Sequence, residues 1–97
     1  MQSQKSKSLE EIRSELKELL VINLALDDIT PEEIEDDGLL FGEGLGLDSL
    51  DAVEIVVLIQ RNYGLEIIDE EQAREIFQSV NTLAGWVYEN LRDRESG

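Results

Sequence analysis

The chain has 97 residues, which suits one small domain with its own hydrophobic core. Its 8 basic and 23 acidic residues give a net charge of −15, which repels nucleic-acid phosphates and anionic membranes, so we expect partners with basic patches, no nucleic-acid binding and no membrane insertion. The absence of cysteine and histidine excludes disulfides, thiolate metal sites and catalysis by a thiol or an imidazole, and we expect no metal site and no enzymatic activity. Because no signal-peptide pattern and no apolar run of roughly 20 residues is present, we expect a cytoplasmic monomer.

The first helix follows a polar segment. Residues 1–7 are expected to form a disordered tail, because they cannot bury enough apolar surface to offset the entropy of ordering. Ser8 and Glu11 match a capping box, and apolar residues at helical spacing follow, which predicts a helix over about 9–24. A second capping pattern at Thr30–Glu33, with proline at its first helical position, predicts a short helical turn.

A long connection precedes the second helix. Glycines at 38, 42, 44 and 46 are interspersed with large apolar residues, so we expect a packed loop rather than a free linker. The expected apolar anchors are Leu39, Leu40, Phe41, Leu45 and Leu47.

The second helix is predicted over about 49–62 and carries two apolar stripes. One stripe has core spacing, whereas the other, formed by Leu50, Val53 and Val57, lies beside carboxylates whose burial would be costly. Two interpretations stay open: the helix is buried on most sides, or the second stripe faces a partner. The core stripe comprises Ala52, Ile55, Val56, Ile59 and Tyr63.

The segment over 65–68 alternates briefly like a strand, but it has no pairing candidate and is predicted to be an extended connection. Asp69 can cap a short third helix over about 70–78. Ser79 or Asn81 can cap the last helix.

The last helix is expected to end near residue 92, with Gly85 allowing close packing. Three longer helices, one short helix and a long structured loop between the first two predict an all-α, small up-down four-helix bundle over 8–92. Residues 93–97 are expected to form a frayed C-terminus.

A serine between two carboxylates lies where the glycine-rich loop becomes the second helix, in the run Gly46-Leu47-Asp48-Ser49-Leu50-Asp51-Ala52-Val53-Glu54. Ser49 has no histidine or nearby lysine to activate it, so we interpret it as the substrate of a modifying enzyme. Free amides and the helix dipole would favour a phosphodiester on its hydroxyl, and the glycines would leave room for that enzyme. Asp48 either caps the helix or helps to hold the enzyme's metal.

This run resembles the acyl carrier protein family of fatty-acid and polyketide synthesis, whose hallmark is Asp-Ser-Leu at the start of the second helix. The similarity continues through Tyr63 and Glu66-Ile67 to Asp69-Glu70-Glu71 and covers roughly residues 9–91. It implies that Ser49 carries 4′-phosphopantetheine, whose terminal thiol holds acyl intermediates as thioesters for fatty-acid, polyketide or related lipid biosynthesis. The implied partners are a phosphopantetheinyl transferase and acyl-transferring and condensing enzymes.

The residues after Ser49 would form a docking face in which charge steers the encounter and apolar contact adds affinity. A solvated helix face is the simpler interpretation of any single carboxylate, and it stays open. Gln60, Arg61 and Ile68 depart from the family pattern, and the glycine-rich, apolar loop over 40–46 resembles that of specialised bacterial carriers. The resemblance therefore favours a dedicated polyketide, aryl-polyene or modified-lipid pathway over housekeeping fatty-acid synthesis. The expected docking face comprises Leu50, Asp51, Val53, Glu54 and Val57.

Three other functions match part of the sequence. With Gly38 as the sixth residue of a calcium loop, Gly44 falls where a glutamate is required, so a calcium module would bind only weakly. The glycines at 42, 44 and 46 follow no strand and precede no P-loop lysine, which argues against a phosphate-binding enzyme. An acidic helical interaction scaffold without acyl carriage keeps the fold, and only modification of Ser49 distinguishes it.

Overall fold

The computed structural model describes residues 7–42 and 44–96, so the expected tail lies outside the described residues apart from Lys7. Within these ranges the chain forms helices and no β-strand, which confirms the all-α class and the small bundle with one short helix. The elements are α1 (Leu9–Asn23), η1 (Pro31–Glu33), α2 (Ser49–Tyr63), α3 (Glu70–Ile76) and α4 (Val80–Ser96).

Three of the helices have N-terminal caps at residues that the sequence indicated. Ser8 Oγ accepts a bond from Glu11 N at 3.1 Å, and the Glu11 carboxylate accepts one from Ser8 N at 2.9 Å, which completes the first capping box. Asp69 accepts an amide of α3 at 3.0 Å. At the start of α4, Ser79 Oγ accepts an amide of the first turn at 3.2 Å, so Ser79 is the cap and Asn81 is not. These bonds offset the cost of leaving first-turn amides unpaired.

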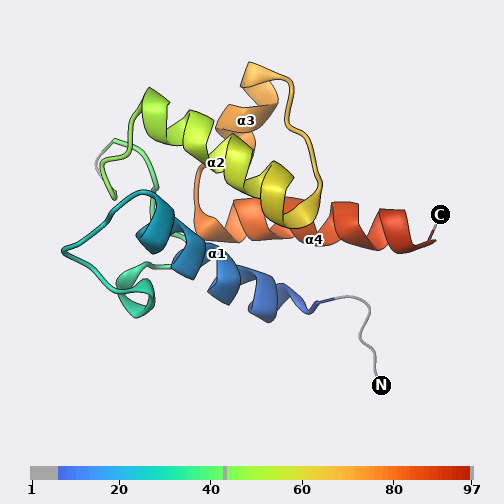
Figure 1. Ribbon diagram of the computed structural model, residues 1–97, viewed down its shortest axis with the longest axis horizontal. Coiled ribbons are helices and arrows are strands. Elements are labelled where there is room, and N and C mark those ends of the chain that lie inside the picture. The colour runs from blue at the N-terminus through green and yellow to red at the C-terminus, as the bar shows by residue number, and fades with distance from the viewer. Residues whose placement is uncertain (1–6, 43, 97) are drawn as a thin grey trace.

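The helices form a compact arrangement in which α1 packs against α4 and η1, and α3 packs against α4 (Figure 1). In Figure 1, α1 runs in the opposite direction to α2 and α4, which run the same way. The extended segment after α2, together with α3, carries the chain back before α4 begins. These directions agree with the expected up-down order, in which the second and fourth helices run opposite to the first.

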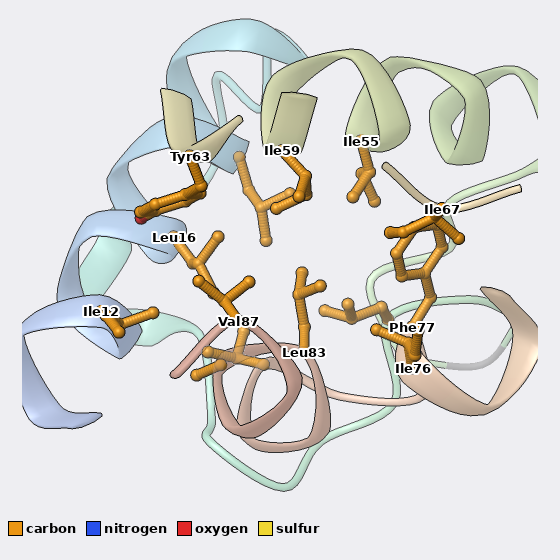
Figure 2. Close-up of a cluster of buried hydrophobic side chains, with 14 of the residues drawn as sticks. Ile12, Leu16, Ile55, Ile59, Tyr63, Ile67, Ile76, Phe77, Leu83 and Val87 are labelled. Atoms are coloured by element: carbon orange, nitrogen blue, oxygen red, sulfur yellow. The ribbon is translucent and has the colours of Figure 1, made fainter. Parts of the chain in front are cut away.

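The four helices bury one shared core, and Figure 2 shows side chains from each of them converging on it. The first stripe of α2 supplies Ile55 and Ile59, which are fully buried, and Leu58, which belonged to neither predicted stripe, is also buried. Burying such side chains is the main driving force for this fold, at about 1.5–3 kcal/mol for each. The core members contributed by the other elements include Ile12, Leu16, Leu20, Ile34, Ile67, Ile76, Phe77, Val80, Leu83 and Val87.

The connection between η1 and α2 is packed, as expected, but one anchor is wrong. Leu39 is 55% exposed, because it lies beside the buried Leu40 and faces a surface groove instead of the core. The amide of Leu40 donates to Gln78 O at 3.0 Å, which fixes the loop to the turn between α3 and α4. The remaining anchors are confirmed: Leu40 and Leu47 are buried, and Phe41 and Leu45 are half-buried against the core.

Two expectations for α4 are corrected. The helix continues to Ser96 rather than ending near 92, because no glycine or proline interrupts the chain between Asn90 and Ser96. Gly85 does not serve close packing, since a Cβ added there would meet no heavy atom within 4 Å. The frayed C-terminus over 93–97 stays a prediction.

Candidate functional site

The loop that leads into α2 depends on its glycines. Gly42 and Gly46 have φ values of 69° and 77°, in the left-handed region that side chains disfavour. A Cβ on Gly44 would lie 1.7 Å from Leu39 O, so only glycine fits there. The glycines thus fix the path of the backbone toward Ser49, and their expected role in giving an enzyme access stays a prediction.

Ser49 is exposed at the first position of α2, directly after the capping residue Asp48. Asp48 Oδ1 accepts bonds from Leu50 N at 3.1 Å and Asp51 N at 3.2 Å, and the Asp51 carboxylate accepts one from Asp48 N at 3.0 Å. The capping role of Asp48 is therefore confirmed.

This cap corrects our expectation of free amides at the start of α2. The N–H groups of Leu50 and Asp51 already bind a carboxylate, so a phosphodiester on Ser49 does not find them available. It would instead lie beside the carboxylates of Asp48 and Asp51. The helix N-terminus alone does not provide the countercharge that a phosphate needs.

The second stripe of α2 lies on the surface. Leu50, Val53 and Val57 are 77%, 61% and 38% exposed, and Glu54 between them is also exposed. Their spacing of three or four residues places them along one side of the helix. The interpretation that α2 is buried on most sides is therefore wrong. Four residues of the expected docking face are therefore exposed on α2 after Ser49. The fifth, Asp51, is half-buried, and its carboxylate accepts the capping-box bond from Asp48 N.

A groove of about 580 Å³ begins at Ser49 and separates α2 from α3. Sequence reasoning missed it, because no periodic signal shows which faces of two different helices stand apart. The groove also brings in two charged residues of α3, Glu70 and Arg74, that we had not considered. Its apolar walls comprise Leu39, Phe41, Ala52, Val53, Val56, Ala73 and Phe77, and its polar margin comprises Asp48, Ser49, Glu70, Arg74 and Gln78.

A polar network holds the segment after η1 against α1 and α4. Lys17 Nζ lies 2.6 Å from Asp36 Oδ1, and Arg13 Nε lies 3.7 Å from Asp36 Oδ2. The hydrogen bond from Lys17 lowers the pKa of Asp36 below its ordinary value. Arg13 also donates to Asn81 Oδ1 at 3.2 Å, and Asn81 Nδ2 donates to Asp37 Oδ1 at 2.9 Å. These contacts hold the N-terminal part of the connection that leads to Ser49.

The other end of α2 is tied to α1 by a hydrogen bond that the sequence did not indicate. Tyr63 Oη donates to Glu15 Oε1 at 2.8 Å, and the Lys7 ammonium binds the same carboxylate. Burial and this bond raise the pKa of the Tyr63 hydroxyl. Burial raises the pKa of Glu15, but the bonds from Lys7 and Tyr63 outweigh it, so its pKa is lowered overall. Both ends of α2 are therefore fixed, which positions Ser49.

Two further observations concern the described residues alone. No helix within 7–42 and 44–96 is long and apolar enough to span a bilayer. In the same ranges, no group of three or more acidic, histidine or cysteine side chains could hold a metal ion.

Comparison with known proteins agrees with this site. The model of the phosphopantetheine attachment site family matches residues 10–87. An acyl carrier protein of Wolinella succinogenes is 40% identical over 60 residues, which are 62% of this chain and 74% of that protein. An acyl carrier protein of Rhodopseudomonas palustris is 32% identical over 84 residues, which are 87% of this chain and 99% of that protein. The chain therefore belongs to the acyl carrier protein family, whose cofactor is 4′-phosphopantetheine.

Proposed function

We propose that Ser49 is the attachment residue for 4′-phosphopantetheine and that the protein carries acyl intermediates as thioesters on this arm. The observation that carries the proposal is the exposed Ser49 hydroxyl at the head of α2, at one end of an apolar groove, inside the Asp-Ser-Leu run. The arm supplies a terminal thiol for the thioester. The protein itself is a carrier and not a catalyst, because the sequence offers no histidine and no nearby lysine to activate Ser49.

Attachment then requires a transferase that provides both a base and a metal ion. The Ser49 oxygen forms a bond to the phosphorus of coenzyme A on the pantetheine side, and the bridging P–O bond of the pyrophosphate breaks. Adenosine 3′,5′-bisphosphate leaves with the bridging oxygen, and the serine proton passes to a base on the transferase. The fixed ends of α2 hold Ser49 for this encounter. Asp48, whose side chain caps α2, is also a candidate ligand of the transferase's metal ion.

The exposed stripe of α2 is the proposed docking face for the transferase and for acyl-transferring and condensing enzymes with basic patches. Leu50 and Val53 supply apolar contact, while Glu54 supplies charge that steers the encounter. An exposed apolar stripe beside carboxylates suits brief binding better than a permanent interface. The proposed location of these encounters is the cytoplasm.

We also propose that the groove between α2 and α3 binds the acyl chain and shields it from solvent. Its walls are mainly apolar and Ser49 is among its lining residues, so an acyl chain on the arm would have apolar surface within reach. This location is at the surface between α2 and α3, rather than in the shared core of Figure 2.

We also propose a dedicated polyketide, aryl-polyene or modified-lipid pathway. Gln60 and Arg61 are both exposed at the end of α2, so the acidic character of the face does not extend along the whole helix. Enzymes that read a continuous acidic face would bind this helix less tightly.

The attachment is tested by intact-mass measurement after incubation with coenzyme A, magnesium and a broad-specificity phosphopantetheinyl transferase. We expect one phosphopantetheine on the wild type and on Ser14→Ala, which changes an exposed serine of α1, and none on Ser49→Ala. An unmodified wild type, beside a carrier that is modified in the same tube, would favour the interaction scaffold instead.

Docking is tested by reversing a charge that has no structural role. Glu54→Lys is suitable because Glu54 is exposed, whereas reversal of Asp51 would also break the capping box. We expect Glu54→Lys to lower kcat/KM for modification by roughly 3- to 10-fold and to reduce its salt dependence. Glu89→Lys, on the exposed side of α4, is the matched control. Equal rates for the two variants would indicate that Glu54 is only part of a solvated helix face and does not contact the transferase.

A further inference from the structure

The groove at Ser49 presents an electrostatic problem for anything attached there. A phosphodiester carries a negative charge, and the nearest charged side chains along the chain are the carboxylates of Asp48 and Asp51. The amides of Leu50 and Asp51 in the first turn of α2 are engaged by Asp48 and are not available to the phosphate. Glu70 adds a further carboxylate to the groove. An anion at this place needs a cation from another element.

Arg74 is the cation that the groove contains. It is exposed on α3 and lines the same groove as Ser49, although 25 positions separate the two residues in the sequence (74 − 49). Within residues 7–42 and 44–92, whose side chains are described, Arg74 forms no ion pair, whereas Lys7, Arg13 and Lys17 each bind a carboxylate. Arg74 is therefore available to an incoming anion.

A structural explanation for Arg74 exists and must be separated from this role. A positive side chain in the last turn of a helix interacts favourably with the helix dipole, and Arg74 lies in the last turn of α3. Arg61 lies in the last turn of α2, is also exposed, and forms no ion pair among the described side chains. Only Arg74 lines the groove, so Arg61 is a matched control.

We propose that Arg74 binds the anionic oxygens of the group carried on Ser49. This inference rests on the proposed attachment at Ser49. Guanidinium presents several donors in a plane, which matches the paired oxygens of a phosphodiester or a carboxylate. Arg74 is exposed at the polar margin of the groove, so we expect this interaction to be sensitive to salt. The anion is either the phosphodiester of the arm or a carboxylate at the far end of the cargo. In the second case, Arg74 favours cargo that ends in a carboxylate.

The test observes the arginine side chains directly by NMR of the Nε–Hε groups in the full chain. The signals of Arg74 and Arg61 are assigned from their loss in Arg74→Gln and Arg61→Gln. Four forms are compared: the unmodified chain, the phosphopantetheinylated chain, and the chain loaded with a butyryl or a succinyl group. Intact mass confirms the state of each sample before measurement.

A change at Arg74 on phosphopantetheinylation, larger than at Arg61, would support binding to the phosphodiester. A change at Arg74 only between the butyryl and succinyl forms would support binding to the cargo carboxylate. In the first case, Arg74→Gln should also shift the ³¹P resonance of the modified chain, while Arg74→Lys and Arg61→Gln should shift it less. Both effects should weaken at high salt.

Equal or absent changes at Arg74 and Arg61 in all four forms would overturn the role of Arg74 while leaving the carrier function intact. A chain that takes up no phosphopantetheine would overturn the proposed function and this inference together.

Discussion

Replacement of Asp48 tests how the start of α2 is stabilised. In Asp48→Ala the amides of Leu50 and Asp51 lose their acceptor, whereas the backbone N–H of residue 48 still donates to the Asp51 carboxylate. Loss of an N-cap costs about 1 kcal/mol, and the range is about 0.5–2 kcal/mol. For a domain of this size that corresponds to a melting temperature about 4–8 °C lower. Asp48→Asn keeps the acceptor and should change the unfolding free energy by only about 0.3 kcal/mol.

Urea denaturation followed by circular dichroism at constant ionic strength measures both variants. If Asp48→Ala is as stable as the wild type, the cap contributes nothing. If Asp48→Asn is as unstable as Asp48→Ala, the charge and not the hydrogen bond stabilises the helix. The same two variants also test attachment. If the Asp48 carboxylate holds the transferase's metal ion, its loss should slow modification of both variants. If Asp48 only caps the helix, Asp48→Asn should be modified at close to the wild-type rate.

Three further predictions concern stability, measured by urea denaturation. Gly44→Ala should destabilise the chain by about 1–3 kcal/mol, because its Cβ would lie 1.7 Å from Leu39 O and the loop must move; wild-type stability would contradict this. Gly85→Ala should stabilise by about 1 kcal/mol, because the site is helical and open, and a loss of stability would reveal a contact there. The pKa of Asp36 in the folded chain is lowered below its ordinary value of 3.8. The ionised carboxylate therefore stabilises the fold above pH 3.8, and this stabilisation is lost as the pH falls through the folded-state pKa. The difference in unfolding free energy between the wild type and Lys17→Met should therefore shrink between about pH 5 and pH 3, and a constant difference would contradict the assignment.

The parts of the fold that were predicted correctly depend on interactions between residues close in sequence. The Ser8–Glu11 capping box, the Asp69 cap and the start of α2 at Ser49 each involve groups within three positions of one another. The exposed stripe of α2 could be predicted for a similar reason, because helical spacing alone places Leu50 and Val53 on one side.

The errors arise where a second element decides the outcome. Leu39 resembles its neighbour Leu40 in every sequence property, yet only the packing of the loop determines which of them enters the core. Gly85 was assigned to a close contact that no neighbouring element makes. The expectation of free amides at the start of α2 is an error of another kind, because the cap that binds two of them, Asp48, is a local interaction that the sequence had also offered.

The sequence by itself determined the helices, their caps, the excess of negative charge and the serine at the head of α2, since these depend on composition and on spacing along one helix. The tertiary structure alone decided which surfaces of α2 and α3 stand apart, and so created the groove that joins Ser49 to Arg74. It also decided the bond between Tyr63 and Glu15, whose partners are 48 positions apart. Such contacts form between residues distant in the chain, and only the relative placement of helices brings them within hydrogen-bonding or van der Waals distance.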